Sequence, residues 1–179
     1  MPHTHLDLGW LQTEQGYYSQ TVKGMFNTAI DYMLNNSRAR LSYSDMGFMY
    51  MWMKDEPNKI SDLKKVIDSG QFHIMHGAFV LNDYATVTLD DMVSNFQYGR
   101  KLLLDNKIML PGSLWSIDQF GIGKAVNAIG RKLGYTEHVT SRLSTEIKGE
   151  LIKNSDMQIY FQSRNAYDRA YGCTLLHLW

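Results

Sequence analysis

The spacing of apolar residues along the chain predicts helices that alternate with strands. Between Thr21 and Leu34, apolar side chains recur every three or four positions, as on the buried face of an amphipathic helix. Residues 41–46 alternate with period two and predict a strand. This strand leads into residues 46–53, where methionines and aromatic residues follow one another, and we expect a short buried helix there.

Five further elements follow in the order helix, strand, helix, strand and helix: 61–70, 72–80, 88–103, 113–117 and 123–133. Ser61 and Thr88 can cap the first two of these helices, and Gly70 and Gly134 are placed to end helices. Strands separated by helices of this length imply parallel pairing with helical crossovers. The sequence therefore predicts an α/β fold, and the residues after Gln162 carry no pattern that assigns them.

Composition narrows the class of protein. The 179 residues, 44% of them hydrophobic and 12% aromatic, are enough to build one domain with a substantial core. The 18 basic and 18 acidic side chains give a formal net charge of zero, which argues against a nucleic-acid binder with a basic face. No apolar run could span a bilayer, and no signal peptide is visible at the N-terminus. Cys173 is the single cysteine, so an internal disulfide is impossible.

The N-terminal segment offers a candidate metal site at His3, His5 and Asp7. In an extended segment, alternate side chains project to the same side, so these three residues could face one ion. Imidazole and carboxylate together form a ligand set that suits zinc. The simpler interpretation is a solvated terminus or the remnant of an affinity tag.

Acidic residues follow two of the predicted strands. Ligands of open parallel sheets bind beyond the carboxyl ends of the strands, where catalytic carboxylates are found. Asp118 comes directly after the strand 113–117 and before Gly121, and its alternative role is to form a turn or to cap a helix. Asn82 and Asp83 follow another apolar segment, and a loop or a helix cap explains them better.

Taken in order, these segments resemble the glycoside hydrolase family 38 α-mannosidases, and the lysosomal type most closely. The resemblance is carried by residues 2–13, 43–48, 77–83 and 115–121, with Arg142 after the next strand. It extends over about residues 2 to 150, and the four motifs stand in the order and approximate spacing of the family. Four motifs in register are specific, whereas each one alone is weak.

The resemblance implies a fold, an activity and roles for individual residues. The fold would be a mostly parallel, distorted barrel-like sheet surrounded by helices. The activity would be retaining hydrolysis of terminal α-linked mannose from glycans, in the lysosome or elsewhere in the secretory pathway. By position, His5 and Asp7 would bind Zn²⁺, and Asp118 would be both a zinc ligand and the nucleophile. Substrate would be bound by Trp10, Phe120 and Arg142.

The sequence also departs from the family pattern. Leu6 stands where the family has Asn or Asp, Tyr84 stands where an acid is usual, and Ile122 replaces a histidine. These changes leave the candidate ligands in place but alter the residues around them. They favour, as an alternative, a diverged and non-catalytic carbohydrate-binding or interaction protein.

The family pattern places its acid/base aspartate and its last histidine ligand beyond residue 179. We therefore expect residues 1–179 to be the N-terminal part of an α-mannosidase catalytic domain, truncated at both ends and inactive in isolation. A third interpretation, a metal-dependent polysaccharide deacetylase, would require an aspartate base and two histidines on one turn, a set that this sequence lacks.

Overall fold

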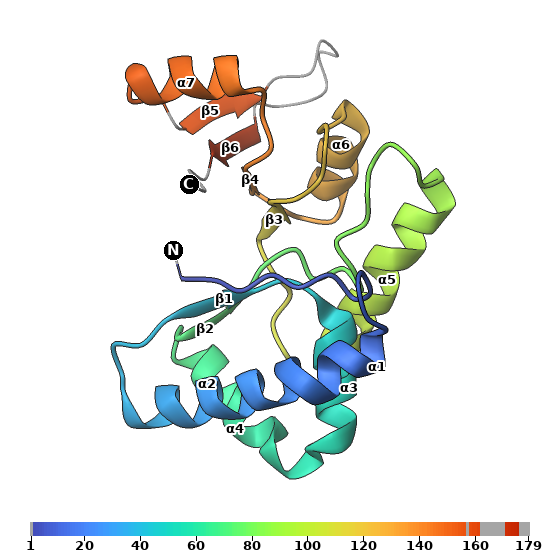
Figure 1. The fold of residues 1–179 in the computed structure, drawn as a ribbon, viewed down its shortest axis with the longest axis vertical. Coiled ribbons are helices and arrows are strands. Elements are labelled where there is room, and N and C mark those ends of the chain that lie inside the picture. The colour runs from blue at the N-terminus through green and yellow to red at the C-terminus, as the bar shows by residue number, and fades with distance from the viewer. Residues whose placement is uncertain (1, 157, 162–170, 176–179) are drawn as a thin grey trace. The chain divides into compact units, whose positions relative to one another are not determined.

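The computed structural model describes residues 2–156, 158–161 and 171–175 (Figure 1). It has the expected α/β character, with helices interspersed between short and mostly parallel strands. The chain divides into two compact units, which are described in turn. Unit 1 comprises Met1–Val80 and Ser94–Leu110, and unit 2 comprises Leu81–Val93 and Pro111–Trp179.

The helices of unit 1 follow the predicted apolar stripes. The stripe between Thr21 and Leu34 forms α2, which is preceded by a short α1 and by a π-helical turn over Tyr18–Val22. The methionine-rich stretch forms α3, and six of its ten residues are buried. The α-helices of this unit are α1 (Glu14–Tyr17), α2 (Lys23–Asn35), α3 (Met46–Asp55), α4 (Ile60–Asp68) and the greater part of α5 (Leu89–Asp105).

Two short strands of unit 1 pair in parallel. β1 (Leu41–Tyr43) lies beside β2 (Phe72–Ile74), with Leu41 opposite Phe72. The N-terminal segment runs along the other edge of β1, where His3 forms a parallel bridge with Ser42 and the Ser42 amide donates to the Pro2 carbonyl at 2.9 Å. The segment that carries the first candidate residues is therefore extended, in register with β1.

An aromatic cluster forms the centre of unit 1. Phe26 of α2 lies within 4.9 Å of the Tyr43 ring, 5.6 Å of the Trp52 ring and 6.2 Å of the Phe72 ring, measured between centroids. These four residues come from two helices and both strands, and each is almost fully buried. Burial of such large side chains stabilises the unit by about 1.5–3 kcal/mol for each residue.

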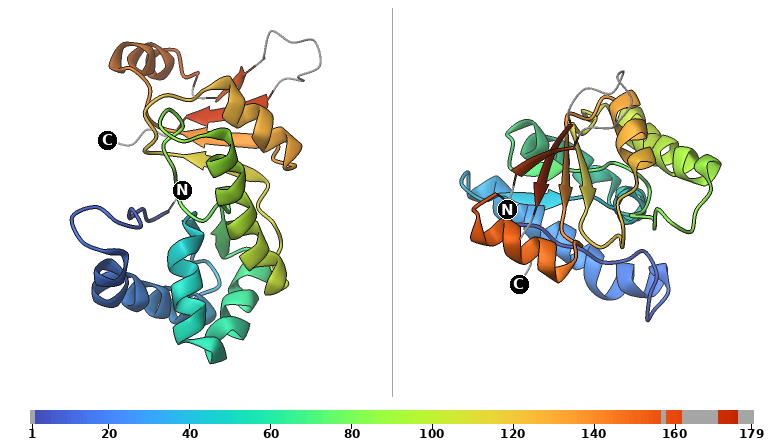
Figure 2. Two further views of the ribbon diagram at one scale, coloured as in Figure 1. Left: turned by 90° about the vertical axis from the view of Figure 1, so that its right-hand side faces the viewer. Right: turned by 90° about the horizontal axis from the view of Figure 1, so that it is seen from above.

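Unit 2 contains a four-stranded sheet in the order β3-β4-β6-β5. The first three strands are parallel, and β5 pairs with β6 in the antiparallel sense. Figure 2 shows the strands side by side, with α6 and α7 among the elements of the same unit. The elements are β3 (Ser113–Ser116), α6 (Lys124–Lys132), β4 (Glu137–Thr140), α7 (Thr145–Lys153), β5 (Gln158–Phe161) and β6 (Tyr171–Leu175). None of the described helices combines the length and apolarity needed to cross a bilayer.

Local predictions were wrong at three points. The strand expected over 72–80 ends at Ile74, because His76 and Gly77 adopt left-handed conformations with φ values of 60° and 72° that break extended structure. The strand expected over 41–46 ends at Tyr43, because Met46 already begins α3. Ser61 does not cap α4, which begins at Ile60 after a short 3₁₀ turn.

Other local predictions are confirmed. The Thr88 hydroxyl accepts a hydrogen bond from the Asp91 amide at 3.2 Å and so caps α5. Gly70 and Gly134 have φ values of 72° and 91° after α4 and α6, where a left-handed residue ends a helix. The strands and helix between Glu137 and Leu175 were not predicted. The unassigned tail after Gln162 falls largely outside the described residues, and the barrel-like closure of the sheet stays a prediction.

We expect Gly99→Ala to destabilise the protein by at least about 2 kcal/mol, because α5 packs its backbone directly against the segment after β2. A Cβ atom at Gly99 would lie 2.2 Å from the Gly77 carbonyl oxygen and 2.5 Å from the Ala78 carbonyl carbon. Urea unfolding of the variant measures this loss. The matched control is Gly24→Ala in α2, where nothing lies within 4 Å and the helix propensity of alanine should add up to about 1 kcal/mol. Equal effects of the two substitutions would contradict the close approach.

Candidate functional site

The N-terminal segment of unit 1 is oriented by its leucines. Leu6 and Leu8 are partly buried and pack against the core of unit 1. The Leu8 methyl groups sit directly over Gly47, since a Cβ atom there would lie only 2.9 Å from each of them. With these apolar side chains turned inward, the alternation of an extended segment leaves His5 and Asp7 on the opposite side. Leu6 is therefore a packing residue.

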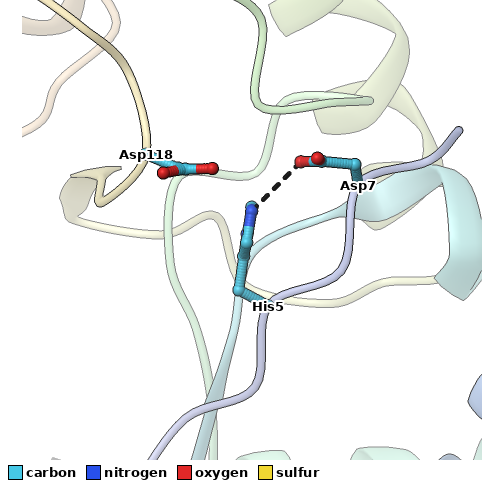
Figure 3. Close-up of side chains that lie close together, drawn as sticks. All are labelled: His5, Asp7 and Asp118. Atoms are coloured by element: carbon cyan, nitrogen blue, oxygen red, sulfur yellow. Dashed lines mark ion pairs between the residues drawn. The ribbon is translucent and has the colours of Figure 1, made fainter. Parts of the chain in front are cut away.

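His5 and Asp7 form a close pair in unit 1. The His5 Nε2 atom lies 3.1 Å from the Asp7 Oδ1 atom, and the two side chains are 20% and 41% exposed (Figure 3). Two ligand atoms bound to one tetrahedral zinc ion at its usual bond lengths are about 3.3 Å apart. The nitrogen and oxygen donors of this pair thus have a separation and a chemistry that fit a shared metal ion. His3, the third member of the candidate group, lies at the bridge to Ser42.

Asp118 of unit 2, the other acid drawn in Figure 3, follows the buried strand β3 by two residues. Arg142, which follows β4, donates hydrogen bonds from both Nε, at 2.8 Å, and Nη2 to the Asp118 Oδ1 atom. The Arg142 guanidinium also lies 5.0 Å from the centroid of the Phe120 ring. Three of the predicted site residues are therefore gathered at the carboxyl ends of two neighbouring parallel strands.

The remaining candidates occupy exposed or loop positions. Trp10 is 75% exposed in a turn of the N-terminal segment, and Phe120 is 68% exposed. Asp83 accepts a hydrogen bond from the Ala85 amide at 2.6 Å, which is the loop role that its sequence context indicated. The two exposed aromatic rings are free of the core, so they present flat apolar surfaces to solvent.

A row of hydrogen-bonded side chains in unit 2 was not found from the sequence. His138 of β4 lies with Nδ1 2.7 Å from the Asn127 Oδ1 atom and with Nε2 2.7 Å from the Ser116 Oγ atom. The Tyr84 hydroxyl lies 2.6 Å from the same Ser116 oxygen. The bonded pairs are separated by 11, 22 and 32 positions in sequence, so only the fold brings them together.

The geometry of this row fixes its proton arrangement. Because the Asn127 oxygen can only accept, Nδ1 of His138 carries the proton and Nε2 accepts from the Ser116 hydroxyl. Ser116 can then accept from the Tyr84 hydroxyl, so every member has a partner. Burial lowers the pKa of His138 to about 4, because the charged imidazolium would lose its hydration. Burial likewise raises the pKa of Tyr84, and both groups are neutral at pH 7.

Comparison with known proteins identifies the family. Residues 1–168 match the family described as "Glycosyl hydrolases family 38 N-terminal domain". The match covers most of the chain, and the chain therefore belongs to glycosyl hydrolase family 38.

Individual relatives agree with this assignment. The chain is 28% identical to alpha-mannosidase 2 of Arabidopsis thaliana over 170 residues, which is 94% of this chain and 14% of that protein. It is 27% identical to the lysosomal alpha-mannosidase of Dictyostelium discoideum, covering 90% of this chain and 17% of that protein. The chain thus spans about a sixth of the length of these relatives.

A solved structure shows the same fold. An alpha-mannosidase from Enterococcus faecalis V583 superposes with a TM-score of 0.76 at 12% sequence identity, over 98% of this chain and 19% of that one. At this level of identity the likeness concerns the fold alone, and it agrees with the α/β architecture expected from the sequence.

The buried His138 predicts a loss of stability in mild acid. Its pKa is lowered from 6.5 to about 4 on folding, so between these pH values the unfolded chain binds a proton that the folded chain does not. The free energy of unfolding should therefore fall by up to about 3 kcal/mol as the pH drops through this window. Urea unfolding at a series of pH values measures it.

The matched control for this experiment is His138→Gln, which remains uncharged throughout. The carboxylates titrate in both proteins, so the difference between the two pH profiles isolates His138. Parallel profiles would show that His138 is not buried as a neutral group.

Proposed function

We propose that this chain is part of a retaining α-mannosidase that removes terminal α-linked mannose from glycans. The observation that carries the proposal is the carboxylate of Asp118, which is fixed by Arg142 at the carboxyl end of β3 in a chain of family 38. The names of the relatives in Arabidopsis and Dictyostelium support mannosidase activity, and the lysosomal relative supports a place in the lysosome or the secretory pathway.

Asp118 acts in this proposal as the nucleophile. One carboxylate oxygen attacks the anomeric carbon of mannose, and the bond from that carbon to the leaving oxygen breaks as the ester bond to Asp118 forms. A carboxylic acid gives its proton to the leaving oxygen. Water then cleaves the ester, and two inversions at the same carbon retain the configuration of the sugar.

Arg142 holds Asp118 ready for this attack. Both of its hydrogen bonds go to Oδ1, so the guanidinium fixes the carboxylate through one of its two oxygens. A charge-assisted contact of this kind restricts the rotation of the carboxylate. The exposed rings of Trp10 and Phe120 would receive the apolar C–H faces of the sugar.

By the family pattern, His5 and Asp7 would bind a zinc ion, with Asp118 as a further ligand. The His5–Asp7 separation of 3.1 Å and the mixed nitrogen and oxygen donors support this part of the proposal. A bound zinc ion would supply Lewis-acid contacts to adjacent sugar hydroxyls and favour distortion of the ring.

The experiments below use the longer protein, which is the α-mannosidase of which this chain is proposed to be a part. We expect His5→Ala to reduce its zinc content from about one ion per chain to a small fraction, because the imidazole ligand is lost. Elemental analysis after dialysis against metal-free buffer measures the content. His73→Ala is the matched control, since His73 is an exposed histidine on β2 of the same unit and should leave the zinc content unchanged. A zinc-free wild-type protein would instead support the alternative of a non-catalytic carbohydrate-binding protein.

Asp118→Asn should lower the hydrolysis of an aryl α-mannoside by the longer protein at least about 10³-fold, because an amide cannot form the glycosyl ester. Initial rates measure the loss, and Asp156→Asn serves as a control at an exposed acid of the same unit. We also expect no turnover by residues 1–179 alone, because the family pattern places the acid that protonates the leaving group beyond residue 179. Full activity of Asp118→Asn would remove this residue as the nucleophile.

A further inference from the structure

Two members of the row Tyr84–Ser116–His138–Asn127 stand a few residues before Asp118 and Arg142 in the sequence. Ser116 is the last residue of β3 and precedes Asp118 by two positions, while His138 lies in β4 and precedes Arg142 by four. The two strands are paired in parallel, with Ser116 opposite Thr140, and the Thr140 hydroxyl donates to the Ser116 carbonyl at 3.0 Å. Asp118 and Arg142 therefore follow the two strands that carry Ser116 and His138 of the row.

The row is not itself a catalytic relay, although a serine, a histidine and an asparagine are joined in it. Ser116 and His138 are fully buried, and the Ser116 oxygen already contacts both the Tyr84 hydroxyl and the imidazole. A nucleophilic hydroxyl must be reached by its substrate. Because the Ser116 hydroxyl is enclosed, the row has a structural role.

Its members link three separate parts of unit 2. Tyr84 belongs to the loop before α5, Ser116 and His138 belong to β3 and β4, and Asn127 belongs to α6. Each of these polar groups is bonded to the next one, so the loss of any member removes a hydrogen bond from a buried group. Such a series of hydrogen bonds is satisfied in one arrangement of these elements. Small displacements between the elements stretch the bonds and cost free energy.

We propose that the Tyr84–Ser116–His138–Asn127 row is a positioning device that fixes the ends of β3 and β4, and thereby the Asp118–Arg142 pair. The role in catalysis rests on the function proposed above, since it assumes that Asp118 is the nucleophile. Displacement of a reacting group by about 1 Å can lower a rate by about 10²-fold. The row supplies the rigidity that keeps Asp118 within such a limit.

The test uses Tyr84→Phe in the longer protein, which removes one hydroxyl and keeps the ring. The control is Tyr43→Phe, another buried tyrosine, which lies in unit 1 outside the row. We expect kcat for an aryl α-mannoside to fall about 10-fold in Tyr84→Phe with KM within about twofold of wild type, and Tyr43→Phe to retain wild-type values. Ser116→Ala, which breaks the row at its centre, should show a larger loss of kcat.

Hydrogen exchange supplies a second readout that does not depend on activity. Amides in a peptide spanning residues 113–121 should exchange at least about 10-fold faster in Tyr84→Phe than in Tyr43→Phe, while peptides from α2 stay unchanged. Unchanged exchange in this peptide overturns the proposal. Faster exchange with kcat equal to that of Tyr43→Phe also overturns it, because the row would then only support packing.

These two readouts separate the present inference from the proposed function. Absence of mannosidase activity in the wild-type longer protein contradicts the proposed function and, with it, the catalytic role of the row. Faster exchange confined to 113–121 would still support the row as the element that fixes the end of β3.

Discussion

The parallel register between β3 and β4 brings Asp118 and Arg142 together at one edge of the sheet of unit 2. Parallel strands end at the same edge of a sheet, so residues that follow the two strands meet there although 24 positions separate Asp118 from Arg142. The row of hydrogen-bonded side chains makes this register costly to change, because a slip would break the contact between His138 and Ser116. The hydrogen bonds of Arg142 then fix the carboxylate itself.

In unit 1, parallel pairing with β1 likewise determines where two candidate site residues lie. The N-terminal segment pairs in parallel with β1, and its leucines pack onto the core while His5 and Asp7 face the other way. A slip of one residue would exchange these two sets of side chains. Burial of Leu6 and Leu8 therefore determines which side of the segment carries the imidazole and the carboxylate. The departure from the family at Leu6 is accommodated by packing, and it leaves the pair intact.

Local patterns predicted most of the elements and several of their ends. The helical stripe before Leu34, the Thr88 cap and the left-handed glycines act through contacts within a few residues, which is why sequence spacing reveals them. Failures came where distant contacts override local preference. The chain after Ile74 turns away from extended structure at His76, which packs against Phe96 with 4.9 Å between ring centroids. The buried row was equally hidden, since the period-two pattern of a strand says nothing about partners on other elements.

The sequence by itself determined the α/β class, the family and the residues that could carry chemistry, because motif order and apolar spacing are properties of the chain. Tertiary structure decided which of those residues have partners and what holds them. Arg142 donates a hydrogen bond to Asp118, and Asp83 accepts one from an amide of its own loop. The Tyr84 hydroxyl is hydrogen-bonded to the buried Ser116. The physical reason is that hydrogen-bond geometry and burial depend on how strands pair and helices pack, and those interactions join residues that are far apart in sequence.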